Sequence, residues 1–364
     1  MSSRAPSCYV GGVAAVGMGL AALAFTTGIA IAPWSPGIHV ALAGLAGGFT
    51  FPGLVYLSLS TSLASGEPRR GLEGLLACTA IIASLLAPLA ALLEARLAPA
   101  LTLTSTLSML AYTSIQARRP RLAKRDFKRL VPVPALGGTA ASIVALIEGG
   151  GVEVLASLLA GGFTLPIAIV FSPVTVGSVY RLEPRVRVLA QSASIPAALS
   201  PLAAPPLGVS AALELALACS VAYLAVMIAG ALGRLFSLGA PGFVAATHIS
   251  AGVGVVGGLA AITVSGRLDY VTLAHVALLG FAAPHAFMHV LVRGGEVPFT
   301  VRRRFWPYPT PAFLALASAL RPLEPSYSWI LVLSALLVEA AAIASLNPVP
   351  PAFKALKGSS FKGH

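Results

Sequence analysis

The chain has 364 residues, of which 57% are hydrophobic and only 10% are charged. A typical soluble domain carries about 25% charged residues, so this chain has too few charges to cover a water-exposed surface. The net charge of +12 does not indicate nucleic-acid binding, because the basic residues stand in short segments between apolar runs. We therefore predict an all-α, polytopic integral membrane protein whose partner is the lipid bilayer.

Twelve apolar segments follow one another along the chain. Most are near the length of about 20 residues that crosses a bilayer as a helix. The eleventh is the shortest, and three prolines crowd its start, so it is either a full crossing or a half-helix. We predict spans at about 8–33, 37–63, 72–93, 97–117, 131–148, 154–180, 188–204, 207–232, 241–264, 271–292, 305–320 and 327–346.

The basic residues predict the orientation of these spans. If the N-terminus lies inside, 21 of the 24 Lys and Arg residues fall in inner segments, and only Arg96, Arg267 and Arg321 fall outside. Cytoplasmic loops carry such an excess of Lys and Arg. We therefore predict a multi-pass cell-membrane protein with both termini in the cytoplasm and a cytoplasmic tail at 351–364.

Two short sequences recur at fixed offsets. LAGGFTFP at 45–52 returns as LAGGFTLP at 159–166, and HVALAG at 39–44 is echoed by HVALLG at 275–280. The recurring sequences fall on spans two, six and ten, which all run from outside to inside. The matches predict a single bundle over 1–350 with a three-fold pseudo-repeat of four helices, in units of about 1–125, 126–238 and 239–350.

His39 and His275 stand near the outer ends of spans two and ten, at matching positions of the predicted repeat. Ionisable residues inside a membrane are rare and usually functional. A bis-imidazole haem iron needs two neutral imidazoles from different helices on opposite faces of the macrocycle. The pair is therefore a candidate for haem ligation. The alternative is that both rings are interfacial residues with their polar edges among the headgroups.

Three further histidines and two acids lie inside spans. His285 and His289 share one helix face, and His248 stands at a similar depth in span nine. Three imidazoles suit Cu, Zn or Fe, whereas a polar helix contact or a proton path would also explain them. Glu214 and Glu339 are either proton-relay groups or hydrogen-bonded interior residues.

The topology resembles that of the core subunit of haem–copper oxidases and of divergent relatives such as the NnrS-type membrane haem proteins. In that superfamily spans two and ten supply the axial ligands of a low-spin haem, so the resemblance implies these roles for His39 and His275. The chain departs from the family pattern because 154–204 contains no histidine for a copper site. Leu273 stands where the ligand of the oxygen-binding haem would be.

The sequence therefore predicts a membrane protein that binds b-type haem. Cu or another transition metal is the other cofactor that its histidines suit. The expected role is electron transfer, or a subunit beside other respiratory-complex subunits, without oxygen reduction. Whether the chain is itself an enzyme is left open. Two alternatives remain: a twelve-span secondary transporter with a proline-broken helix at its substrate site, and a cofactor-free structural subunit.

Overall fold

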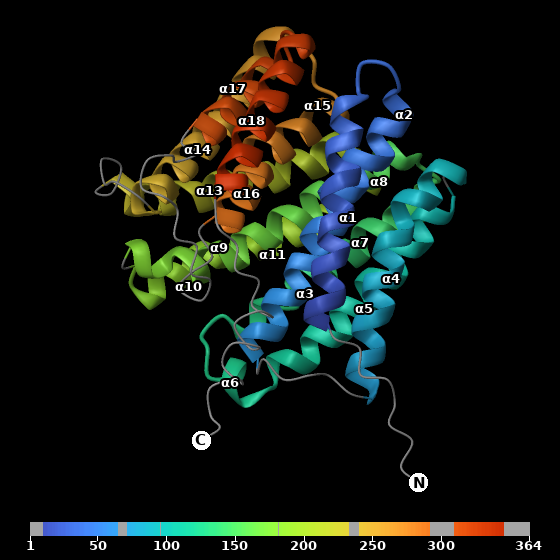
Figure 1. Ribbon diagram of the computed structural model, residues 1–364, viewed down its shortest axis with the longest axis vertical. Helices are drawn as coiled ribbons and strands as arrows, with labels where there is room; N and C mark the ends of the chain where they lie inside the picture. The colour runs from blue at the N-terminus through green and yellow to red at the C-terminus, as the bar shows by residue number, and fades with distance from the viewer. Residues whose placement is uncertain are drawn as a thin grey trace, which may run out of the picture.

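The computed structural model describes residues 10–64, 71–94, 96–180, 182–232, 240–291 and 309–345. The predicted tail at 351–364 lies outside these ranges. Within them every regular element is a helix. Figure 1 shows α4 and α5 on one side of the molecule and α14 and α17 on the other, with α1 and α18 next to each other between them.

The helices of the first third lie at the positions of the first four predicted spans, although α1 and α5 are not among the stretches long and apolar enough to cross a membrane. Three helices joined end to end make the second span. The elements are α1 (Val10–Ala30), α2 (Pro36–His39), η1 (Val40–Thr50), α3 (Phe51–Ala64), α4 (Gly71–Leu93) and α5 (Leu97–Ala117). Two short helices follow in the basic segment, α6 (Pro120–Ala123) and η2 (Lys128–Leu130).

The middle third contains one long composite helix, one broken segment and one continuous helix. The composite helix is formed by α8 (Val152–Leu159), η3 (Ala160–Thr164) and α9 (Leu165–Tyr180), and it follows α7 (Val133–Glu148). The broken segment consists of α10 (Pro184–Ser192), α11 (Ser194–Leu199), η4 (Ser200–Ala203) and α12 (Ala204–Leu207). The continuous helix is α13 (Val209–Ala231).

The last third again contains a composite helix between two simpler ones. The composite helix is α15 (Tyr270–His275), η6 (Val276–Ala282) and α16 (Ala283–Leu291). The others are α14 (Ala240–Ser265), α17 (Pro309–Leu320) and α18 (Pro325–Ser345). The eleventh predicted segment thus has only 12 described helical residues, in α17.

The seventh predicted span, 188–204, differs from the single helix that we expected. It is divided into short pieces that turn at Ala193, Ser200 and Ala204. Pro196, Pro201, Pro205 and Pro206 cause the division, because each lacks the N–H of a helical hydrogen bond and its ring crowds the preceding turn.

Eight of the described helical stretches are long and apolar enough to cross a membrane. Large apolar side chains also cover the outside of the bundle: Leu93, Ile147, Val264 and Leu337 are each more than 70% exposed. A surface of this kind is unfavourable in water and suits lipid. The chain is therefore an α-helical membrane protein.

The composite helix α8–η3–α9 is the most buried of the eight stretches. Within Val152–Val174, 89% of the most apolar 18-residue window is buried, against 28% for Pro325–Ala342 in α18. Its π-helical part η3 contacts both η1 and η6. The second, sixth and tenth predicted spans therefore meet at the centre, and α18 lies at the edge.

Each of these three central helices contains a π-helical segment that ends two residues before a proline. The segments end at Thr50, Thr164 and Ala282, and the prolines are Pro52, Pro166 and Pro284. A proline cannot donate to the carbonyl four residues earlier, and the extra residue of a wider turn accommodates its ring. π-Helices hold well under 1% of residues in soluble proteins, so three at corresponding places are a structural feature of this chain.

Glycines let neighbouring helices touch through their backbones. A Cβ added to Gly137 of α7 would stand 1.9 Å from the Gly162 carbonyl oxygen of η3. A Cβ on Gly254 of α14 would stand 3.0 Å from the Gly280 Cα of η6. Close backbone approach of this kind replaces the hydrophobic effect as a packing force in membranes.

We expect Gly137→Ala to lower the free energy of unfolding in detergent by about 1–3 kcal/mol, because the added methyl overlaps backbone atoms that cannot move aside. Thermal unfolding of the purified protein measures the loss. Gly19→Ala is the matched control, since a Cβ there meets no atom within 4 Å. Equal melting midpoints for the two variants would contradict the close contact.

Candidate functional site

His39 and His275 come together as predicted from the sequence. Their ring centroids are 6.0 Å apart and the ring planes differ by 14°. His39 is the last residue of α2 and His275 the last of α15, and each directly precedes a π-helical segment. The two rings therefore project from equivalent positions on the two composite helices.

Backbone carbonyls fix the orientation and tautomer of both rings. His39 Nδ1 donates to the Gly28 carbonyl of α1 at 3.0 Å, and His275 Nδ1 donates to the Val271 carbonyl at 2.7 Å. A carbonyl only accepts, so each Nδ1 must carry the proton. Each Nε2 is then left with a lone pair, which is the arrangement found in metal-ligating histidines.

Charged groups surround the outer side of this pair. The Arg321 guanidinium, in the turn between α17 and α18, acts electrostatically on both imidazoles. Burial lowers the pKa of Arg321, the Asp269 carboxylate opposes that shift, and Arg267 adds to it. Asp269 also caps α15 by accepting from the Thr272 backbone N–H at 2.8 Å. Arg321 thus lies near both histidines, and Arg267 lies near Arg321.

An apolar cavity of about 420 Å³ begins one helical turn inward from the pair. Ala43 and Leu279, each four residues beyond one of the histidines, line its outer end, and His285 lines it further inward. The remaining walls come from α1, α3, α9 and α16. The cavity is therefore lined by one histidine of the described chain, His285, and by residues one turn beyond His39 and His275.

His248 and His285 form a second, fully buried pair. Their centroids are 5.0 Å apart and the ring planes are nearly perpendicular, at 89°. Tyr223 of α13 lies 6.4 Å from His248 and 6.0 Å from His285, measured between ring centroids. The side chain of His289, the third predicted member, lies outside what the structure describes.

Tyr223 was not predicted from the sequence as a site residue, because a lone tyrosine in an apolar helix looks like an ordinary core residue. In the described part of the chain, no three His, Cys, Asp or Glu side chains gather as a metal-binding group. Among the described side chains, Tyr223 is the polar residue that lies beside both rings.

The two predicted proton-relay acids occupy different environments. Glu214 is exposed on the outer face of α13, within its second turn. Glu339 of α18 is only 3% exposed and lies beside Thr310 of α17, although neither carboxyl oxygen makes a hydrogen bond of normal geometry. Only Glu339 has the buried setting in which an ionisable group usually has a function.

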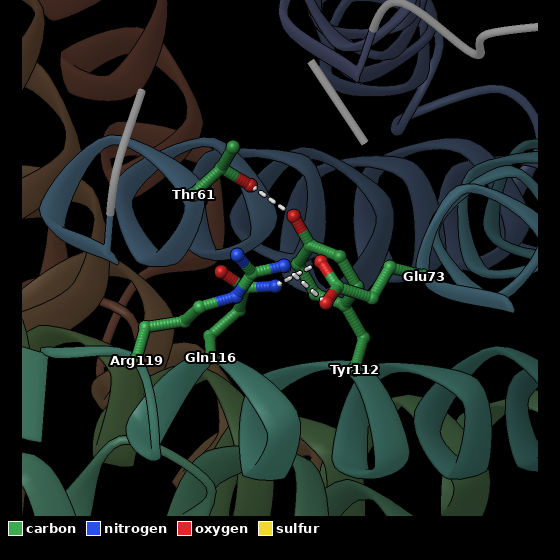
Figure 2. Close-up of polar contacts among 5 residues, drawn as sticks. All are labelled: Thr61, Glu73, Tyr112, Gln116 and Arg119. Carbon is green, nitrogen blue, oxygen red and sulfur yellow. Dashed lines mark hydrogen bonds and ion pairs between the residues drawn. The ribbon is translucent and has the colours of Figure 1, made fainter. Parts of the chain in front are cut away.

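A polar cluster where α3, α4 and α5 meet was also not predicted from the sequence. Figure 2 shows the Glu73 carboxylate of α4 facing Gln116 and Arg119, while Thr61 of α3 hydrogen-bonds Tyr112 of α5 at 2.6 Å. Arg119 forms an ion pair with Glu73, and Gln116 Nε2 donates to Glu73 Oε2 at 3.1 Å. The three-residue spacing of Gln116 and Arg119 was the only signal for this cluster, which joins the helix ends.

No protein-family model, curated protein or solved structure matches the chain. The function must therefore be inferred from the residues and their geometry.

We expect Glu73→Gln and Arg119→Gln each to lower the free energy of unfolding by about 1 kcal/mol, since the ion pair is only partly shielded from solvent. The double variant should lose less than the sum of the two, because either single change already breaks the pair. Denaturation in detergent measures all three, with the exposed Arg121→Gln as control. Strict additivity would contradict a direct interaction.

Proposed function

We propose that the chain is an integral membrane protein that binds b-type haem, with His39 and His275 as the two axial ligands. The single observation that carries the proposal is the nearly parallel imidazole pair, 6.0 Å apart, with both Nδ1 atoms held by backbone carbonyls. The proposed role is electron transfer, alone or as a subunit of a respiratory complex.

The separation of the rings fits bis-imidazole ligation. Two iron–nitrogen bonds of about 2 Å, with about 1 Å more from each nitrogen to its ring centre, require centroids about 6 Å apart. The observed 6.0 Å agrees with this requirement. Nearly parallel ring planes are also compatible with two ligands on one axis.

The surroundings fit the rest of a haem as well. The macrocycle carries two carboxylates, and the Arg321 guanidinium beside both histidines is a suitable partner for one of them. The apolar cavity that begins at Ala43 and Leu279 offers room on the inner side of the pair. When bound, the iron would supply one-electron transfer, while this chain's residues hold the ligand tautomers and exclude water.

The proposed protein crosses the cell membrane twelve times and has both termini in the cytoplasm. Its helices form three units of four. Each predicted span has helix at its position, although the seventh is broken by prolines. The π-helical segments η1 and η6 each start directly after a histidine, and η1 and η3 each end at the Thr of the recurring LAGGFT sequence. These coincidences support equivalent units.

We propose a relationship to haem–copper oxidase core subunits, and we extend it only to the site of their low-spin haem. Spans six and seven hold no histidine, and Leu273 replaces the ligand of an oxygen-binding haem. The residues therefore support electron transfer and offer no support for oxygen reduction.

We expect the purified protein, supplied with haem, to give the absorption spectrum of a six-coordinate, low-spin haem. His39→Leu and His275→Leu should each abolish it, because leucine has similar bulk but no lone pair. His275→Met is the matched variant: thioether ligation should keep a six-coordinate haem with a higher reduction potential. Absorption spectroscopy and a redox titration make the comparison.

Two outcomes would contradict the haem proposal. The absence of a Soret band in haem-supplied wild-type protein would end it. Retention of one copper or other transition-metal ion that depends on His39 and His275, without haem, would assign the pair to a bare metal ion.

A further inference from the structure

His285 provides a buried metal-ligand atom for which the haem proposal has no use. Its ring is 1% exposed, and Nδ1 donates to the Phe281 carbonyl at 2.7 Å. That bond fixes the proton on Nδ1, so Nε2 holds a lone pair, and Nε2 has no hydrogen-bond partner. A buried acceptor without a donor is costly and needs an explanation such as an ion.

His248 lies beside His285 on the neighbouring helix and has the same tautomer. Its Nδ1 donates to the Val244 carbonyl at 2.9 Å, so its Nε2 is also the ligating atom. Backbone carbonyls that hold Nδ1 in this way are the usual outer partners of metal-bound histidines. Both rings are therefore oriented in advance by their own helices.

The distance between the two rings matches a shared tetrahedral ion. An ion bound to Nε2 stands about 3 Å from the ring centre, so centroids 5.0 Å apart subtend about 110° at the ion. That is the tetrahedral angle. For His39 and His275, whose ring centroids are 6.0 Å apart, the same ion-to-ring distance of about 3 Å gives an angle near 180° between the two rings at the ion.

Tyr223 occupies the place of a third ligand. A phenol oxygen bound to the same ion would put the tyrosine ring about 6 Å from each imidazole, given bonds of about 2 Å and tetrahedral angles. The observed separations are 6.0 and 6.4 Å. The hydroxyl is fully buried and has Ser172 near it, but makes no hydrogen bond of normal geometry.

We propose that His248, His285 and Tyr223 form a tetrahedral site for a d¹⁰ transition-metal ion, Zn²⁺ or Cu⁺, with one coordination position open. Imidazole suits both ions, and a filled d shell imposes no geometry against the one that the helices provide. The apolar cavity that His285 lines gives an ion or a fourth ligand a route to the open position. The site is independent of the haem pair.

The test uses the full-length protein, without an affinity tag, stripped with a chelator and then given Zn²⁺, Cu⁺ or Co²⁺ alone. Co²⁺ replaces Zn²⁺ and reports tetrahedral geometry through intense visible d–d bands. We expect one ion per chain and a higher melting midpoint with metal. Competition with a chelator of each ion shows which of Zn²⁺ and Cu⁺ is held more tightly.

His285→Leu and His248→Leu should each weaken binding at least 100-fold, and Tyr223→Phe about 10-fold. His275→Leu is the matched control, because it removes a histidine of the same composite helix from the haem pair and should leave metal affinity unchanged. If a leucine variant does not fold, His285→Gln, which is smaller and polar, takes its place.

Three results would overturn the proposal: less than one ion per chain, Co²⁺ bands of an octahedral ion, or unchanged affinity in His285→Leu. Because His275→Leu destroys only the haem pair and His285→Leu only the second pair, failure of one proposal is distinguishable from failure of the other.

Discussion

The hydrogen bond from a histidine Nδ1 to a backbone carbonyl is the interaction on which both candidate sites depend. It is present in all four histidines whose side chains the structure describes. In a medium without water, an imidazole N–H must find a partner. For His248, His275 and His285 the partner is the carbonyl of the preceding turn, whereas His39 uses Gly28 of α1. Once that bond forms, every one of these rings presents Nε2 as a base. The chain thus holds two pairs of oriented ligand atoms inside its apolar bundle.

The backbone of the central helices explains why the outer pair is brought together. Prolines in the three central helices are each preceded by a π-helical segment, which changes the direction in which residues beyond it project. His39 and His275 stand at the start of two such segments, where α2 and α15 end. Direct backbone contact at Gly28 and Ala43 brings α1 close enough for the Gly28 carbonyl to accept from His39. A bulkier residue at position 28 would remove that support without touching either ring.

Much of this arrangement could be predicted from the sequence, and the parts that could not have physical causes. Apolar length located the helices, because a membrane requires unbroken hydrogen-bonded backbone over about 20 residues. It failed at 188–204, where proline content mattered more than hydropathy. Depth along the helix predicted that His39 would meet His275, since a span fixes height above the membrane centre. It could not predict that Glu214 faces outward, because a uniformly apolar helix carries no periodic signal of which side is buried.

Tyr223 and the Glu73 cluster were missed for a related reason. Both depend on which helices are neighbours, and twelve apolar segments of similar length leave that choice open. The structure packs α13 against α14, and so brings Tyr223 beside His248. Likewise α4 packs along α5, and Glu73 meets Arg119. Charge and length therefore predict where a residue lies along the membrane normal, while its partners follow only from packing.

The two histidine pairs differ in the kind of coordination that their geometry fits. Parallel rings 6.0 Å apart fit ligands on opposite sides of one iron, whereas perpendicular rings 5.0 Å apart fit adjacent corners of a tetrahedron. The outer pair adjoins charged groups that suit a carboxylate-bearing cofactor. The inner pair lies beside the rings of Phe281 and Tyr223, and His285 also lines the apolar cavity. Helix packing, which sets ring separation and angle, therefore decides the chemistry that each pair supports.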